Sequence, residues 1–232
     1  MERDNWWYVS RREMIDSLLE KISFPPDAVA LDVGCGVGSN LPPLRRHART
    51  VYGLDISPHA LAYAHQQGFD KLVEASAESI PYADETADIV TCMDVLEHLD
   101  DSRAMAEVVR VLKKKGTILI TVPAFPSLWN ENDDYGHHLR RYRKQKLKAL
   151  IEHHGLVVDR LSYWNFLFFL PVWLVARFYR KSRANSNQVH NNLSYIPSFL
   201  NPLLIRLMRF ERWISSLSPL PFGVSLYAVA HK

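Results

Sequence analysis

The sequence predicts a single doubly wound α/β domain, in which helices cover both faces of a parallel sheet. Three observations point to this fold class. Short apolar segments alternate with amphipathic helical segments along residues 28–163, which is the pattern of βαβ units. A glycine-rich turn follows the first apolar segment directly. The chain has 232 residues, enough for one substantial domain with a buried sheet.

The pattern of apolar residues places each element in order. Strands are expected at 28–33, 50–54, 71–74, 87–93, 116–122, 156–163 and 224–230. Helices are expected at 11–23, from about 39, and at 57–67, 101–112 and 144–154. Ser57 is a typical N-cap followed by proline, and Gly155 is typical of a helix end. Two apolar helices, 166–180 and 198–217, flank a polar linker before the final strand.

Composition and charge restrict the class of protein. The net charge of +3 is too small to predict nucleic-acid binding. The cysteines, Cys35 and Cys92, are too few for a disulfide framework, so a reduced, cytoplasmic setting is expected. The N-terminus lacks the apolar core of a secretory signal. The apolar run at 166–176 is interrupted by Pro171 and has about half of the roughly 20 residues that cross a bilayer, which leaves only peripheral membrane contact open.

The segment 31–38, LDVGCGVG, lies between the first strand and the next helix. Its glycines, Gly34, Gly36 and Gly38, let the backbone turn sharply and approach a ligand closely. Asp55 ends the second strand, where a carboxylate lies beside the loop and can accept hydrogen bonds from both ribose hydroxyls of a nucleoside. The loop and this carboxylate together predict a nucleoside-cofactor site.

Two nucleoside cofactors suit such a site, and the details of the loop separate them. Dinucleotide sites use the spacing G-x-G-x-x-G, because a pyrophosphate lies on the helix N-terminus. Here the spacing is G-x-G-x-G, and Pro42 and Pro43 supply no amide donors to the following helix. Asp32, directly before the glycines, would repel a pyrophosphate but attracts the ammonium of a methionine group. S-adenosylmethionine is therefore favoured over a dinucleotide and over a plain tight turn.

Five ordered blocks of sequence resemble the class I methyltransferase family, in its ubiquinone-biosynthesis-like, type 11 branch. They read LDVGCGVG, GLDIS, EASAESIPY, DIVTCMDVLEHL and RVLKKKGTILITVP. The resemblance covers residues 28–163 and the final strand, 223–232. It implies an S-adenosylmethionine-dependent methyltransferase with a Rossmann-like, seven-stranded sheet whose last strand is antiparallel. The whole chain, 1–232, is then one domain, with a helical lid at 1–24 and a helical insert at 164–222 that caps the substrate.

The resemblance also assigns residues of this chain to parts of the cofactor. The loop glycines line the methionine side, Asp55 binds the ribose and Ile56 packs on the adenine. The block Ser76, Ala77 and Glu78 usually begins with an aspartate that accepts a hydrogen bond from the adenine amino group. The serine departs from this pattern, so its hydroxyl, the glutamate or a water is expected to make the contact instead. The other cofactor-binding residues expected are Met93, at the end of the fourth strand, and Trp7 and Arg11 of the lid.

Methyl transfer requires mainly that the acceptor be aligned and water excluded, and a base is required only for a neutral hydroxyl or a protonated amine. A polar loop follows the fifth strand, at the edge where ligands bind in this fold. Its His137 and His138 are candidate catalytic bases; the alternative is a surface loop with balanced charges. Candidate acceptor contacts are Trp129, Tyr135 and Arg140 in this loop and Trp164 at the start of the insert.

Other interpretations are weighed against this one. Glu97 and His98 are interpreted as solvated charges at a helix start, and no metal site is expected, because no histidine or carboxylate recurs at ligand spacing on a predicted helix. A nucleic-acid methyltransferase is disfavoured, because residues 94–97 read DVLE where such enzymes have a Pro-Pro-aromatic motif. A non-catalytic cofactor-binding protein stays open. The favoured function is transfer to oxygen of a small, hydrophobic or lipid-linked acceptor, with no nucleic-acid partner and no oligomeric state predicted.

Overall fold

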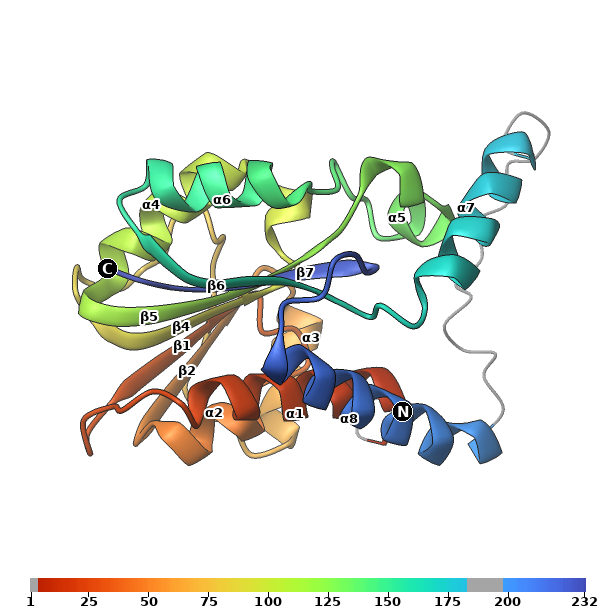
Figure 1. Cartoon of the computed structure of the whole chain (residues 1–232). Coiled ribbons are helices and arrows are strands. Elements are labelled where there is room, and N and C mark those ends of the chain that lie inside the picture. The colour runs from red at the N-terminus through yellow and green to blue at the C-terminus, as the bar shows by residue number, and fades with distance from the viewer. Residues whose placement is uncertain (1–3, 183–197) are drawn as a thin grey trace.

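The computed structural model describes residues 4–182 and 198–232, which form a seven-stranded sheet with helices on both sides (Figure 1). The strands are β1 (Val29–Val33), β2 (Thr50–Asp55), β3 (Leu72–Glu74), β4 (Ala87–Met93), β5 (Leu112–Pro123), β6 (Val157–Trp164) and β7 (Ser225–His231). Their order across the sheet is β3-β2-β1-β4-β5-β7-β6. The first five strands pair in parallel, whereas β7 is antiparallel to both β5 and β6. The predicted doubly wound sheet with an antiparallel last strand is confirmed.

Two apolar cores lie between the sheet and its helices. One face is covered by α4 (Asp101–Val111) and α6 (Lys144–His153), and the other by α1 (Trp6–Leu19), α2 (Leu41–His47), α3 (Pro58–Gln66) and α8 (Asn201–Leu217) (Figure 1). Successive side chains of a strand point to opposite faces. Strand β1 accordingly places Ala30 in the core beneath α1 and Leu31 in the core beneath α4.

The loops that follow the parallel strands meet at one edge of the sheet. The short helical turn η1 (Leu96–His98) follows β4, and the turn η2 (Pro126–Leu128) and helix α5 (Glu131–Tyr135) follow β5. Tyr142 connects these loops: its side chain is fully buried, and its hydroxyl lies 2.7 Å from Asp101 Oδ2 and 3.1 Å from the carbonyl oxygen of Leu96. These hydrogen bonds hold the segment that follows β5 against the segment that follows β4.

Three elements differ from the expectation based on sequence. Helix α1 begins at Trp6 rather than at residue 11, because the Asn5 side chain accepts a hydrogen bond from the Trp7 N–H and caps the helix there. Strand β5 begins at Leu112 rather than at 116. Helix α5 lies in a segment expected to be a loop, and a capping box formed by Asn130 and Asp133 begins it.

The two helices of the insert lie in different places. Helix α7 (Phe169–Ser182) lies beside η2, whereas α8 packs along α1 (Figure 1). Glu13 of α1 forms ion pairs with Arg209 and Arg212 of α8. The predicted polar linker falls largely on residues 183–197, outside the described residues. No helix in the described part of the chain is both long and apolar enough to cross a membrane.

Candidate functional site

The connection between β1 and α2 is a tight loop whose backbone is fixed by β2. The N–H groups of Gly34 and Cys35 donate hydrogen bonds to the carbonyl oxygen of Leu54, at 2.7 and 2.9 Å. Gly34 has a φ of 73°, and a Cβ there would lie 2.3 Å from the side chain of Val95. Gly36 has a φ of 52°, but a Cβ there would meet no atom within 4 Å. The chain therefore requires glycine at the first position for packing, whereas the second faces open space that a ligand can fill.

Asp55 holds this loop and borders a pocket at the same edge. One carboxylate oxygen accepts a hydrogen bond from the Gly36 N–H at 2.7 Å, and the other accepts one from the Ser57 N–H at 2.9 Å. Each oxygen keeps capacity for a further donor. The pocket has a volume of about 220 Å³ and is lined by Gly34, Leu54, Asp55, Ile56, Ala75, Ala77, Asp94, Val95, His98 and Leu99. Ile56 is 71% exposed and offers an uncovered apolar surface to it.

Asp32, near the end of β1, is a buried carboxylate beside the glycine loop. Its Oδ1 accepts a hydrogen bond from the Thr91 hydroxyl at 2.6 Å, and its Oδ2 accepts none from the residues that the structure describes. Burial raises the pKa of Asp32 to about 7, because the charged form loses its hydration. A cationic partner at Oδ2 would offset that loss.

The beginning of α1 reaches the same edge. Arg11 forms an ion pair with Asp94, the residue after β4. Its guanidinium lies 5.6 Å from the centre of the Trp7 ring and 5.9 Å from that of Tyr8, within the range of cation–π attraction. The Trp7 ring in turn packs on Trp164, with 5.2 Å between the centroids. The residues expected in a lid thus contact the pocket wall at Asp94.

The two adjacent histidines after β5 have different surroundings. His138 Nδ1 lies 2.8 Å from Asp133 Oδ1, and the same oxygen accepts a hydrogen bond from Arg141 Nε at 2.7 Å. Asp133 is fully buried, which alone would raise its pKa, but these two hydrogen bonds outweigh burial and lower the pKa of this carboxyl. His137 is exposed. His138 is therefore the histidine that the loop holds in a fixed orientation.

Turn η1 brings a second histidine and another carboxylate beside His138. The His98 and His138 rings meet edge to face, with 4.7 Å between their centroids. Glu97 is fully buried, which corrects its interpretation as a solvated charge, and neither of its carboxylate oxygens has a hydrogen-bond partner among the described residues. Burial and the nearby Asp94 raise the pKa of Glu97 well above its ordinary value. Desolvation and the neighbouring His138 lower the pKa of His98.

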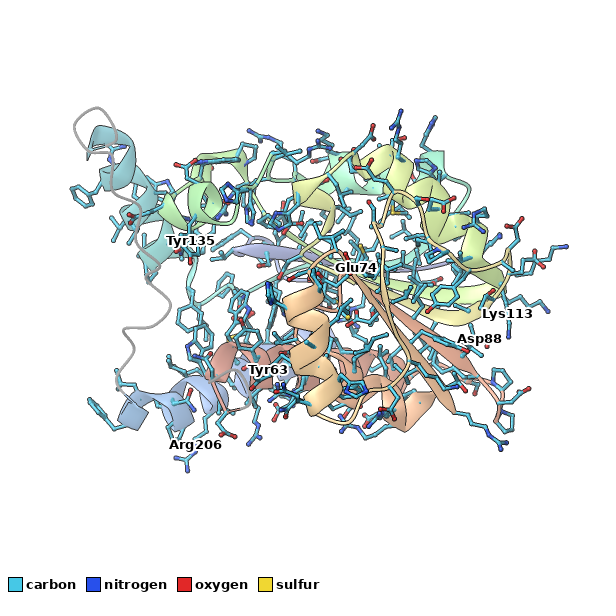
Figure 2. All side chains as sticks on the ribbon, turned by 180° about the vertical axis from the view of Figure 1, so that it is seen from behind. Tyr63, Glu74, Asp88, Lys113, Tyr135 and Arg206 are labelled. Atoms are coloured by element: carbon cyan, nitrogen blue, oxygen red, sulfur yellow. The ribbon has the colours of Figure 1, made fainter. Side chains whose placement is uncertain are left out.

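Several residues expected to contact the acceptor have other partners. Arg140 pairs with Asp101 at 2.8 Å, and the arginine that turns inward is its neighbour Arg141. The Trp129 indole N–H donates to an oxygen of Asp134 at 3.0 Å. Tyr135 is 56% exposed at the end of α5 (Figure 2).

Some residues expected to bind the cofactor lie outside the pocket as well. Met93 is buried in the core beneath α1, and so is Trp164, which was expected to contact the acceptor. The Ser76 hydroxyl accepts a hydrogen bond from the Glu78 N–H at 3.1 Å, and the Glu78 carboxylate accepts one from the Asp100 N–H at 2.9 Å. At Gly38 a Cβ would meet side chains of α2 and α3, so this glycine allows helices to pack. Of the block 76–78, Ala77 alone lines the pocket.

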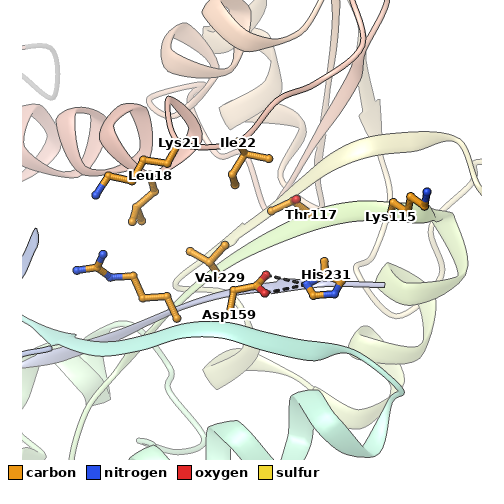
Figure 3. Close-up of a pocket in the computed structure, with 9 residues that line it drawn as sticks. Leu18, Lys21, Ile22, Lys115, Thr117, Asp159, Val229 and His231 are labelled. Atoms are coloured by element: carbon orange, nitrogen blue, oxygen red, sulfur yellow. Dashed lines mark hydrogen bonds and ion pairs between the residues drawn. The ribbon is translucent and has the colours of Figure 1, made fainter. Parts of the chain in front are cut away.

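A second hollow, of about 370 Å³, lies at the opposite edge of the sheet (Figure 3). It is lined by Leu18, Lys21, Ile22, Lys115, Thr117, Asp159, Arg160, Val229 and His231. Its polar centre is a His231–Asp159 pair, 2.8 Å apart. Ligands of open α/β sheets bind at the carboxyl ends of the parallel strands, and this hollow lies at their other end. The smaller pocket is therefore the candidate site.

Comparisons with known proteins concern the class of protein. Residues 31–120 match the family model of a methyltransferase domain. An uncharacterized protein of Methanocaldococcus jannaschii is 35% identical over 119 residues, which cover 51% of this chain and 51% of that protein. The 2-methyl-6-phytyl-1,4-hydroquinone methyltransferase of Arabidopsis thaliana is 34% identical over 124 residues, or 50% of this chain and 37% of that protein. The chain thus spans about half the length, or less, of these curated relatives.

A solved structure extends the likeness of fold to nearly the whole chain. A SAM-dependent methyltransferase from Archaeoglobus fulgidus superposes with a TM-score of 0.59 over 95% of this chain and 94% of that one, at 19% identity. The sheet order, the glycine loop and the carboxylate after β2 define a class I methyltransferase fold. The segment 31–120 thus matches the methyltransferase-domain family, as the five sequence blocks predict, and nearly the whole chain has the fold of S-adenosylmethionine-dependent methyltransferases.

Sequence reasoning missed the roles of Glu97, Asp133 and Arg141. A signal existed for Asp133, since an asparagine three residues before it forms the start of a capping box. No signal distinguished Arg141 from Arg140, or His138 from His137, because adjacent loop residues point in directions that only the folded backbone decides.

The raised pKa of Asp32 predicts how stability depends on pH. The folded chain holds this proton up to about pH 7, whereas the ordinary value of an aspartate is 3.8. The folded state therefore binds more protons between these values, and the free energy of unfolding falls as pH rises from about 4 to about 7. An asparagine cannot ionise, so the free energy of unfolding of Asp32→Asn should not show this part of the decrease with pH. Thermal denaturation across that interval measures the difference.

The matched control is Asp70→Asn, since the Asp70 side chain is 81% exposed. It should follow the original chain at each pH. If Asp32→Asn also follows it, the buried carboxyl does not titrate as we infer.

Proposed function

We propose that the protein transfers a methyl group from S-adenosylmethionine to a hydroxyl oxygen of a small, hydrophobic or lipid-linked acceptor. Asp55 carries the proposal for the cofactor. Its two oxygens are fixed by the N–H groups of Gly36 and Ser57, at 2.7 and 2.9 Å, yet the side chain borders the open pocket. A carboxylate oriented in advance is suited to accept hydrogen bonds from two ribose hydroxyls.

Other residues fit the remaining parts of the cofactor. Ile56 offers an exposed apolar surface on which adenine can pack. The pocket, at about 220 Å³, is smaller than the roughly 300–1,000 Å³ usual for small-molecule sites. The methionine part is therefore proposed to lie along Gly36, where the loop faces open space. Its ammonium would then be near the unpartnered oxygen of Asp32.

The chain has three tasks in the reaction. When bound, S-adenosylmethionine supplies a methyl group already activated by the sulfonium charge. The residues around the pocket bind and orient it, and Arg11 and Trp7 limit the access of water at Asp94. For a hydroxyl acceptor, a proton must also leave. We assign control of this proton to His138, because Asp133 fixes its ring and His137 has no comparable support.

Asp55→Ala tests the cofactor site. The change should remove two charge-assisted hydrogen bonds of about 1.5–3 kcal/mol each, and so weaken binding of S-adenosylmethionine by at least about 100-fold. Calorimetric titration measures the affinity, and thermal denaturation checks the fold, because Asp55 also holds the glycine loop. Asp70→Ala changes an exposed aspartate that precedes β3; it is the control and should bind normally. Unchanged affinity in Asp55→Ala would contradict the assignment.

His138→Ala tests the proton step, with His137→Ala as the adjacent control. On a hydroxyl acceptor, loss of His138 should lower turnover by roughly 10²–10⁴-fold, while binding of S-adenosylmethionine stays unchanged. A panel of phenols, hydrophobic alcohols and matching carboxylic acids, assayed with labelled cofactor, measures the effect. His137→Ala should be nearly as active as the original chain. Equal losses in both variants, or transfer to carboxylates alone, would rule out the proposed hydroxyl acceptor with His138 in control of its proton.

A lipid-linked acceptor agrees with an exposed apolar face on α8. The face consists of Leu203, Leu207, Phe210, Trp213 and Leu217, which recur every three or four residues and are between 37% and 71% exposed. The only acidic residue of α8, Glu211, is buried, whereas Arg206 projects outward (Figure 2). Exposed aromatic and aliphatic residues beside arginine are typical of helices that lie on anionic lipid surfaces. We propose that this face contacts such a surface.

A vesicle-binding experiment tests the membrane contact. The full chain should sediment with vesicles of phosphatidylcholine and phosphatidylglycerol, and more weakly with phosphatidylcholine alone. The double variant Phe210→Ser, Trp213→Ser removes two apolar side chains worth about 1.5–3 kcal/mol each when buried, so binding should fall at least about tenfold. Tyr63→Ser, on the exposed side of α3 (Figure 2), should not change it. A concentration-dependent dimer that the double variant abolishes, with no vesicle binding, would assign the face to a second copy instead.

A further inference from the structure

Three metal-ligating side chains converge beside the pocket. They are Glu97 and His98, from η1, and His138, from the loop after β5. One ligand atom from each lies within 4.8 Å of the other two. The ligand atoms of a single small divalent ion, with bonds of about 2.0–2.2 Å, lie roughly 3–4.4 Å apart. Slight rotation of the side chains would therefore bring all three to one ion.

Glu97 provides an independent observation that points to a cation ligand. The side chain is fully buried, and neither oxygen has a hydrogen-bond partner among the described residues. Arg11 and Arg141 are close enough to influence Glu97 electrostatically, but their guanidinium groups form ion pairs with Asp94 and Asp133 instead. A buried carboxylate without a partner is costly, and buried charges are found paired or bound to metal.

His138 is oriented as metal-binding histidines usually are. Its Nδ1 lies 2.8 Å from Asp133 Oδ1, and a carboxylate at this distance favours the tautomer in which Nδ1–H donates and Nε2 is free to bind a metal. Asp133 is held in turn by Arg141 Nε and by the N–H of Asn130, at 2.7 and 2.8 Å. A carboxylate that holds the far nitrogen of a ligand histidine fixes the tautomer and raises metal affinity.

We propose that Glu97, His98 and His138 bind a divalent first-row cation such as Zn²⁺. Two imidazoles and one carboxylate favour such an ion over Mg²⁺ or Ca²⁺, which prefer oxygen ligands. Three protein ligands leave a coordination position open, and His98 also lines the cofactor pocket, so the proposed site borders the place where the cofactor would bind. This set could not be predicted from the spacing of residues, because its members come from a short turn and a distant loop rather than from one helix.

The cation would deepen the function proposed above, on which its role in catalysis rests. An acceptor hydroxyl at the open position would have its pKa lowered by the cation, and its proton would pass to water before transfer. His138 then controls the proton as a ligand of the cation. Binding of the cation itself does not depend on the acceptor and can be tested without it.

The experiment titrates Zn²⁺, and separately Co²⁺, into the chelator-treated full chain. We expect one equivalent to bind, with a rise in melting temperature and, for Co²⁺, a visible absorption band. Glu97→Gln and His138→Ala should each weaken binding by more than the roughly 10–100-fold expected for Asp133→Asn, which removes only the supporting carboxylate. His137→Ala should bind as the original chain does. Glu97→Gln should also fold well, because glutamine is neutral and close in size to the buried carboxyl group.

Two results would overturn the inference. One is that Zn²⁺ binds the original chain no more tightly than Glu97→Gln. The other is that binding survives in that variant and disappears when His153 and His154 are replaced, which would locate the ion at another histidine pair. Failure of the proposed function has a different signature. If methyl transfer persists in chelator, the role of the cation in catalysis fails and the proposed function does not; if the cation binds at Glu97 but no hydroxyl acceptor is methylated, only the hydroxyl-acceptor function fails.

Discussion

The pair of hydrogen bonds accepted by Asp55 is the interaction on which the site depends. Through it, the loop after β1 and the turn after β2 hold the same carboxylate, at 2.7 and 2.9 Å. The glycine loop is further tied to β2 through the Leu54 carbonyl, so neither loop can shift without the other. In a parallel sheet the strand ends are aligned by the ladder hydrogen bonds, but the loops beyond them are not. Here Asp55 holds two of these loops together and can still accept hydrogen bonds from a ligand.

Three buried carboxylates at this edge show three ways of accommodating a charge away from water. Asp133 receives hydrogen bonds from His138, Arg141 and a backbone N–H, which keep its pKa low. Asp32 receives one hydrogen bond and titrates at about 7. Glu97 receives none among the described residues. Both oxygens of Asp133 therefore accept hydrogen bonds. Asp32 and Glu97, which lie beside the glycine loop and the histidines, keep oxygens without a hydrogen-bond partner among the described residues. Incomplete polar groups in a packed protein are more informative about ligands than complete ones are.

The fold could be predicted from the sequence because its signals are local or periodic. Every strand of the sheet was expected within a few residues of its place, since apolar runs, Ser57 as a cap and Gly155 as a helix end report on their own neighbourhoods. The glycine loop and Asp55 could be predicted because their positions follow from the topology. The histidine loop could not be resolved to single residues, and the burial of Glu97 was missed, because each depends on which side of an irregular turn faces inward. That choice is made by contacts with distant segments, such as those of Tyr142 with Leu96 and Asp101.

The position of β7 has a consequence for how the chain folds during synthesis. In the sheet, β6 joins the other strands only through β7, and Ser225 aligns with both Pro123 and Trp164. The first five strands can pair as they emerge from the ribosome, but β6 must wait until residues 225–231 have been made. Until then the outer side of β5 is an unpaired edge that can pair with strands of other chains. A segment late in translation therefore closes the sheet, and pairings over such long sequence separations form slowly. The edge of β5 thus stays open to pairing with other chains until β7 has been made.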